Sequence, residues 1–225
     1  MSVETELRRL VIRELPLAFW DRMAKGAPRV YKESHTRATK DAGWGESEGR
    51  YMLPHFRHSL FEHLFRTSAL AAGLMAVSKW NFAGNYEYTV VRAKRLVLMV
   101  CHVDGANEVV RPSLFRKESA LVNHILSNPT LKSNDPKVVV FDPPKLYAAK
   151  EICAYIIHGA SKVDPSSYGF VRVVFPEKGS QKYVENYDLF ELYTISLSNA
   201  QSQDSDLDIA HPRLRRKKKG ESENE

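Results

Sequence analysis

The sequence predicts an α+β fold: an N-terminal helical region followed by a small mixed sheet with packed helices, and a disordered charged C-terminal tail. Apolar residues recur at helical spacing through residues 1–80, and short strand-like apolar segments dominate residues 81–200. From residue 201 to 225 the chain is polar and lacks aromatic residues. With 43% hydrophobic and 27% charged residues among 225, the composition excludes a fully disordered chain and a disulfide scaffold. We therefore expect a single domain over residues 1–200.

The first eighty residues are expected to form three helices. The first stretch ends at Pro16 and carries apolar residues at helical spacing at Val3, Leu7, Leu10 and Val11. A second, short helix has Pro16 near its start and Gly26 just past its end. Residues 27–52 contain the glycine-rich stretch AGWGESEGRY, which favours a loop. A long amphipathic helix is expected from about residue 54 to residue 78.

The second half has the patterns of strands. Residues 94–103 are nearly continuous in apolar side chains, which is typical of a central strand buried on both faces. Residues 112–127 are amphipathic and predict a helix packed on the sheet. Further strands are expected at 137–142, 151–158 and 170–175, the last two pairing antiparallel, while 183–197 fits either a helix or a strand.

Two features predict a cytoplasmic protein that does not interact with a membrane. The N-terminus mixes charges into its apolar residues, so it lacks the apolar segment of a signal peptide. The longest apolar run, Leu96–Cys101, is far too short to cross a bilayer. The two cysteines, Cys101 and Cys153, each lie inside an apolar segment. We expect both to be reduced, buried side chains.

Basic residues point to nucleic acid as a partner. The tail contains six basic and six acidic residues, so the body carries the whole net charge of +6. Between residues 79 and 117, cations alternate with aromatic residues, a pattern that suits phosphates and unstacked bases. The same composition also fits a solvated face over core aromatics. The predicted contacts are Arg92, Lys94, Arg95, Arg111, Arg116 and Lys117 in the body, and Arg215, Arg216, Lys217, Lys218 and Lys219 in the tail.

A second hypothesis is a metal-dependent hydrolase acting on phosphodiesters. On a helix, His55, His58, Glu62 and Arg66 fall within one narrow sector. The first three residue types can converge on one divalent metal, and the arginine could hold a phosphate. A further ligand would have to come from His102 or Asp104, after the strongest strand. The simpler interpretation is the polar face of an amphipathic helix, and the HExxH pair that would make the assignment specific is absent.

A third hypothesis is a protein-interaction or regulatory subunit, with Trp44 and Tyr51 of the glycine-rich segment as its contacts. The sequence contains no phosphate loop, nucleophile elbow or CxxC pair. We therefore take nucleic-acid binding without catalysis as the first hypothesis, expect no resident cofactor under it, and leave open whether the chain is an enzyme.

Overall fold

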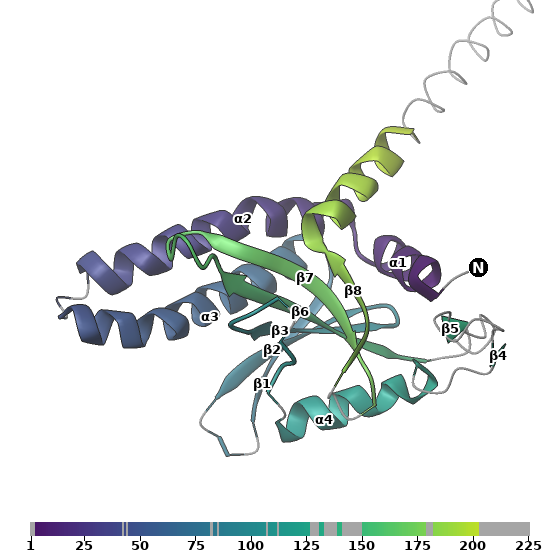
Figure 1. The fold of residues 1–225 in the computed structure, drawn as a ribbon. Helices are drawn as coiled ribbons and strands as arrows, with labels where there is room; N and C mark the ends of the chain where they lie inside the picture. Colours follow the sequence, from purple (N-terminus) through teal and green to yellow (C-terminus); the bar gives the residue numbers. More distant parts are fainter. Residues whose placement is uncertain are drawn as a thin grey trace, which may run out of the picture.

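A six-stranded mixed sheet forms the centre of the protein, with helices on both faces (Figure 1). This is the α+β fold that the sequence predicts. The computed structural model describes residues 3–41, 43, 45–81, 83, 84, 86–106, 108–111, 113–126, 131, 132, 139, 140, 150–178 and 182–202. The tail prediction for residues 201–225 therefore lies almost wholly outside the described residues.

The sheet consists of two antiparallel halves that meet at one parallel pair. The strand order is β1-β2-β3-β6-β7-β8, and only β3 and β6 run parallel. A separate two-stranded sheet pairs β4 with β5. The strands are β1 Met75–Trp80, β2 Glu87–Ala93, β3 Leu96–His102, β4 Leu131–Lys132, β5 Val139–Val140, β6 Ile152–Ala160, β7 Tyr168–Pro176 and β8 Tyr183–Asp188.

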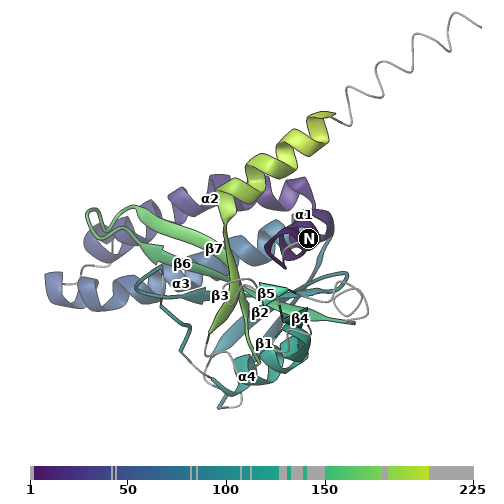
Figure 2. The same cartoon turned by 45° about the vertical axis from the view of Figure 1, so that its right-hand side comes forward.

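One face of the sheet is covered by α1 (Val3–Glu14), α2 (Leu17–Thr36) and α3 (Glu46–Ala71), with a further helix at residues 189–202. The other face is covered by α4 (Leu114–Ala120) and the 3-10 helix Leu121–Leu126 that continues it. Figure 2 shows α1 and the helix at 189–202 side by side. In the described residues, no helix is both long and apolar enough to span a bilayer.

Side chains along the central strands point alternately to the two faces of the sheet and fill a hydrophobic core on each face. In β3, Leu96, Leu98 and Val100 pack under the three N-terminal helices. Their neighbours Val97, Met99 and Cys101 pack toward α4. Burial on both faces explains why this strand is continuously apolar in sequence, and its predicted central position is confirmed. Both cysteines are buried and free, as expected.

The predicted loop at residues 27–52 is wrong, because helix occupies most of that segment. α2 continues through Gly26 and Pro28 to Thr36, and a π-helical turn, Arg37–Asp41, follows it. Gly26 lies inside α2 and does not end it. A side chain at this position would lie 2.3 Å from Leu64 of α3, so the contact with α3 explains the glycine. The glycine allows the two helices to approach closely, which is a packing role that resembles a stop signal in sequence.

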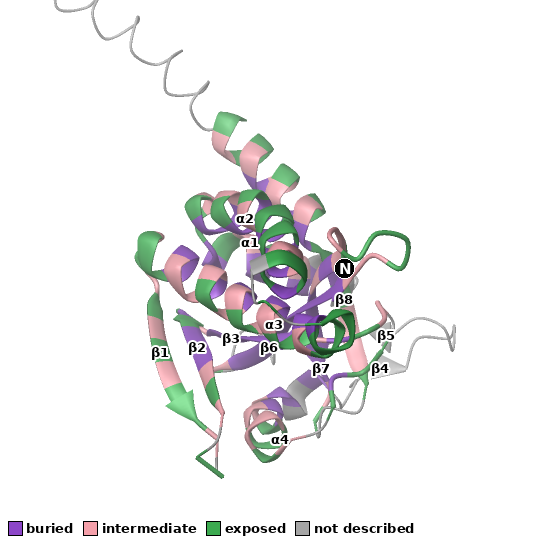
Figure 3. Ribbon diagram, turned by 90° about the vertical axis from the view of Figure 1, so that its left-hand side faces the viewer, coloured by how far each residue is buried: buried purple, intermediate pink, exposed green. Residues whose placement is uncertain are grey.

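The predicted helix at 54–78 is also displaced. α3 begins at Glu46 and contains Pro54 inside it, and it ends at Ala71. Residues 75–80 form the edge strand β1 instead of a last helical turn. In Figure 3 this strand is largely exposed or half-buried, so its sequence lacks the apolar run by which the inner strands were recognised.

The remaining predictions differ in outcome. The strands at 151–158 and 170–175 form and pair antiparallel, as β6 and β7. The ambiguous segment 183–197 contains both elements, with β8 leading into the helix at 189–202. The helix expected at 112–127 shortens to α4 and the 3-10 turn after it. Of the strand expected at 137–142, Val139–Val140 is described and forms β5, and the other positions lie outside the described residues.

Candidate functional site

Two histidines lie at the carboxyl ends of the two central strands, β3 and β6, which run parallel. His102 and His158 are register partners in the β3–β6 ladder. In a parallel pair, register partners project to the same face, so both side chains lie on the face that α3 covers. Their rings meet edge to face, with centroids 5.3 Å apart. The carboxyl ends of parallel strands are a common position for binding sites.

His158 is fully buried and fixed by its neighbours. Its Nδ1 shares a hydrogen bond of 2.8 Å with the hydroxyl of Tyr31 from α2. Phe61 of α3 stacks on its ring at 3.9 Å. His58, one helical turn before Phe61, lies parallel to the same ring at 6.2 Å. Three imidazoles from α3, β3 and β6 are thus brought together.

A first hollow lies between α3 and the β1–β2 hairpin, with a volume of about 370 Å³. Within it, His58 Nε2 shares a hydrogen bond with the Tyr86 hydroxyl and lies 3.9 Å from Glu62 Oε1. The other carboxylate oxygen, Oε2, accepts a hydrogen bond of 3.2 Å from the backbone N–H of Thr89 in β2. Arg66 lines the same hollow and donates to Ser78 Oγ at 3.4 Å.

A second hollow of about 610 Å³ lies beyond His55, which lines both. Arg50 and Tyr51 contribute from the first turns of α3, Arg111 comes from the segment that leads into α4, and Arg116 comes from α4 itself. Tyr51 is 74% exposed, so its ring is available to a ligand. Two acidic residues, Asp104 and Glu108, also line this hollow. We call the two hollows together the α3 cleft.

Burial shifts the pKa values of Glu62 and His58, which line the first hollow, in opposite directions. Burial raises the pKa of Glu62 to about 7, against the lowering effect of the Thr89 hydrogen bonds and of Arg116 and Arg66. Burial also lowers the pKa of His58 to about 4, assisted by His102, Arg116 and His55. At neutral pH, His58 is therefore a neutral imidazole beside a carboxyl group that exchanges its proton easily.

Within the part of the chain that the structure describes, several buried polar atoms at this site have no hydrogen-bond partner. They include the second oxygen of Glu62 and one ring nitrogen from each of the three histidines: Glu62 Oε1, His58 Nδ1, His102 Nε2 and His158 Nε2. Unsatisfied buried polar atoms are costly in a folded protein and occur preferentially where a ligand or catalysis uses them. Their concentration around one cleft identifies it as the candidate site.

The predicted metal ligands are only partly brought together. His58 and Glu62 face one another in the first hollow, whereas His55 lies exposed between the two hollows. Within the part of the chain that the structure describes, no three His, Cys, Asp or Glu side chains are arranged to hold a metal ion. His102 and Asp104 line the second hollow. The metal assignment therefore gains no support from the geometry.

The predicted cationic surface is divided between separate parts of the fold. Arg92, Lys94 and Arg95 lie where β3 begins, whereas Arg111 follows the end of that strand, and Arg116 and Lys117 lie on α4 under the sheet, where the Arg116 carbonyl accepts a hydrogen bond from the Tyr155 hydroxyl. Where β3 begins, Arg92 pairs with Glu151 and the backbone N–H of Arg95 donates to Glu14 at 2.9 Å. The tail cations, from Arg215 to Lys219, and Trp44 lie outside the described residues.

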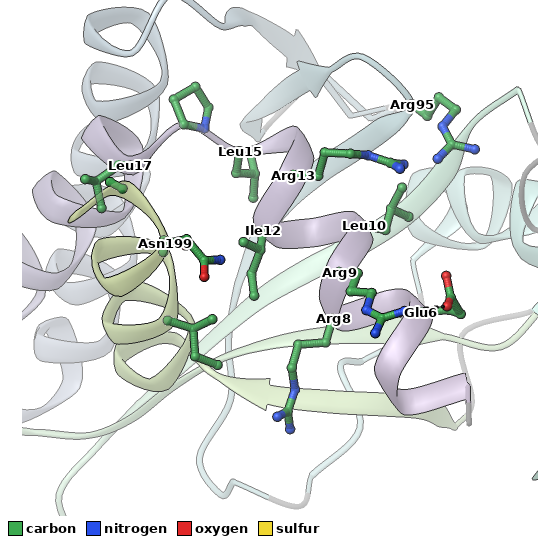
Figure 4. Close-up of a pocket in the computed structure, with 14 residues that line it drawn as sticks. Glu6, Arg8, Arg9, Leu10, Ile12, Arg13, Leu15, Leu17, Arg95 and Asn199 are labelled. Carbon is green, nitrogen blue, oxygen red and sulfur yellow. Dashed lines mark hydrogen bonds and ion pairs between the residues drawn. The ribbon is translucent and has the colours of Figure 1, made fainter. Parts of the chain in front are cut away.

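A larger hollow of about 750 Å³ separates α1 from the helix at residues 189–202 (Figure 4). Its arginines already have carboxylate partners. Arg8 pairs with Glu191 at 3.2 Å, and Arg13 and Arg95 both contact Glu14, at 3.3 and 3.4 Å. The pairs Arg8–Glu191 and Arg95–Glu14 connect α1 to the rest of the fold, which gives this hollow a structural explanation.

Sequence analysis missed His158, Tyr31 and Arg50. One signal for His158 was available, because the two most apolar strands, β3 and β6, both carry a histidine near their carboxyl ends. Parallel pairing in register places such residues side by side. Nothing in the sequence indicated Arg50 or Tyr31, since the segment 27–52 had been interpreted as a loop.

Comparisons with protein-family models, with curated proteins and with solved structures find no match for this chain. The function is therefore argued from the geometry of the α3 cleft.

Proposed function

We propose that the protein binds single-stranded nucleic acid in the α3 cleft. One observation carries this proposal: the exposed ring of Tyr51 shares a hollow of about 610 Å³ with Arg50, Arg111 and Arg116. An exposed aromatic ring can stack with an unpaired base, and arginines can hold the adjoining phosphates. The volume suits a nucleotide-sized ligand and is too confined for a duplex.

The charges at the cleft favour an anion only modestly. Arg50 is already paired with Glu46, and Asp104 and Glu108 oppose the other arginines. Arg116 donates through one terminal nitrogen to the carbonyl of Arg111, which positions its guanidinium beside the hollow. Affinity should therefore depend on stacking as well as on charge. The basic run from Arg215 to Lys219 adds a sequence-independent attraction, and the target is expected in the cytoplasm.

Fluorescence anisotropy with labelled single-stranded and duplex oligonucleotides tests the proposal. Tyr51→Ala should weaken single-strand binding by about 1–3 kcal/mol, the usual value of one stacked base. Arg111→Gln should weaken binding and lower the salt slope by about 0.7, as expected for one lost phosphate contact. Lys25→Gln, which removes a cation paired with Asp21 on α2, is the matched control and should leave binding unchanged.

A second variant decides which end of β3 is used. Lys94 is exposed in the β2–β3 turn, at the opposite end from the cleft. Lys94→Gln should weaken binding less than Arg111→Gln does. If Lys94→Gln has the larger effect, the interface lies at the turn and the cleft proposal is wrong.

A further inference from the structure

The first hollow of the α3 cleft contains a base, an acid and a cation that the binding proposal does not use. Neutral His58, the carboxyl group of Glu62 and the guanidinium of Arg66 all line a volume of about 370 Å³. Each has a different chemical capacity: to accept a proton, to donate one, and to stabilise a negative charge. All three project from α3, where spacings of four residues place them on one side of the helix.

We propose that this hollow cleaves single-stranded RNA by general acid–base catalysis, with the 2′-hydroxyl of the substrate as the nucleophile. The inference rests on the proposed function, because the second hollow would hold the adjoining nucleotide. His55 lines both hollows, so a strand held on Tyr51 can continue directly to His58. RNA is the substrate because it carries its own nucleophile, and its cleavage requires only proton transfer and charge stabilisation.

The contact between His58 and Tyr86 shows where a hydroxyl can sit. The Tyr86 hydroxyl shares a hydrogen bond with His58 Nε2, and its ring stacks on the imidazole at 5.6 Å. Tyr86 directly precedes β2, at the end of the β1–β2 turn. Displacement of the phenol by the substrate would bring the ribose 2′-hydroxyl to the same nitrogen. Tyr86 is thus a positioning residue, whose hydroxyl remains hydrogen-bonded to His58 Nε2 until the substrate enters.

The reaction balances without any co-reactant. His58 takes the proton from the 2′-hydroxyl while the 2′-oxygen forms a bond to phosphorus. The bond between phosphorus and the 5′-oxygen breaks, and Glu62 gives its carboxyl proton to that leaving oxygen. The products are a 2′,3′-cyclic phosphate and a 5′-hydroxyl. The proton then returns from His58 Nε2 to Glu62, whose nearest oxygen is 3.9 Å away, which restores both groups.

The pKa values of His58 and Glu62 agree with their roles as base and acid. Burial lowers the pKa of His58 to about 4, so the imidazole is neutral and can accept a proton. Burial raises the pKa of Glu62 to about 7, so the carboxyl retains a proton at mildly acid pH. Cleavage should therefore be fastest between these values and fall above pH 7. Among the described residues, the charged and titratable groups around the pair are His55, His63 and Arg66 from α3, Tyr86 and Glu87 from the β1–β2 hairpin, His102 from β3, His158 from β6, and Arg116 from α4.

The test uses the full chain, with EDTA present and two labelled oligonucleotides of the same sequence. One is RNA, and the other is 2′-O-methyl RNA, which lacks the nucleophile. We expect the RNA alone to be cut, with mass spectrometry identifying the cyclic phosphate. Glu62→Gln and His58→Asn should each slow cleavage by at least about 100-fold, while 2′-O-methyl RNA still binds. Glu33→Gln and His35→Asn on α2 are the matched controls and should cut at the wild-type rate.

The outcomes separate the inference from the proposed function. Binding of 2′-O-methyl RNA without cleavage of RNA overturns the inference and leaves the binding proposal standing. Absence of both binding and cleavage overturns both. Cleavage that requires a divalent metal, or that persists at the wild-type rate in Glu62→Gln and His58→Asn, also overturns the inference. Circular dichroism of each variant establishes that the fold is retained.

Discussion

Glu62 shows how burial changes the chemistry of one side chain. A carboxyl group on the outer face of a helix would be ionised at neutral pH. Here β2 covers it, and among the described residues its Oε2 accepts a hydrogen bond from the backbone N–H of Thr89 while its Oε1 has no hydrogen-bond partner. The protonated form is therefore favoured in the folded protein. The arrangement is costly for stability and useful for proton transfer, which is the combination expected at a functional site.

The burial of Glu62 predicts how the free energy of unfolding depends on pH. The pKa of Glu62 is raised from 4.5 to about 7 in the folded protein. Its stabilising contribution is thus fully present below pH 4.5 and is lost as the pH rises through 7. The stability of the wild type relative to Glu62→Gln should fall across this range, by on the order of 3 kcal/mol at most.

Urea denaturation of both proteins at pH 4.5 and pH 8 measures this difference. His58, with its lowered pKa, changes stability in the opposite direction, so the same comparison in the His58→Asn background removes its titration and isolates Glu62. Parallel stability profiles for the two proteins would show that the carboxyl is not buried as described.

At the scale of elements, the α2–α3 hairpin depends on glycines at close contacts. Gly49 lies in the second turn of α3, and a side chain there would lie 2.3 Å from the carbonyl oxygen of Ala38. Ala38 belongs to the π-helical turn between the two helices. Because the contact involves backbone, neither partner can move aside by changing a rotamer.

Gly49→Ala should therefore destabilise the protein by about 1–3 kcal/mol. Helix propensity alone predicts the opposite, a gain of about 1 kcal/mol. Thermal or urea unfolding decides the sign, with Ser47→Ala, at an exposed position two residues earlier in α3, as the control. A stabilised Gly49→Ala variant would mean that α2 and α3 are not packed as closely as described.

The sequence predicted the elements whose burial is strong and failed where glycine and proline have packing roles. Residues 94–103 and 151–158 were recognised because both faces of those strands are buried. The edge strand β1 was missed because its outward side chains are exposed. Gly26 and Pro54 were interpreted as helix boundaries, whereas both lie inside helices. Tertiary packing overrides these local signals, and it is not visible in a single sequence.

The sequence predicted the part of the candidate site that lies on one helix and missed the part that other elements contribute. His58, Glu62 and Arg66 lie on one helix, so periodicity alone placed them together. Their partners Tyr86, in the β1–β2 turn, and His158, on β6, lie elsewhere in the chain, and no spacing rule links them. The division of the cationic residues between separate parts of the fold likewise depends on tertiary structure, which composition does not reveal.

At the scale of the whole molecule, charge is distributed between the body and a balanced tail. The body carries +6, and the tail has its cations in one run followed by acidic residues. This run can approach phosphates irrespective of base sequence, whereas the α3 cleft would prefer unpaired bases. The two parts should therefore contribute separately to affinity and to strand preference.

Replacing Lys217, Lys218 and Lys219 together with glutamine in the full chain tests this separation. The slope of log affinity against log salt should become shallower by about 2 for single strands, as expected for three lost cations. The preference for single strands over duplex should stay unchanged in the anisotropy measurement. A lost preference would show that the tail, and not the cleft, discriminates between them.

The parallel pairing of β3 with β6 also predicts the order in which the sheet assembles. The strands on either side of it, β1-β2-β3 and β6-β7-β8, are joined to their sequence neighbours, so each half closes only short loops. The β3–β6 ladder instead joins Leu96 to Ile152, across the long crossover, and such non-local pairing is slow. Because that ladder places His102 beside His158, we expect this histidine pair, which lies next to the α3 cleft, to come together after the two antiparallel halves of the sheet.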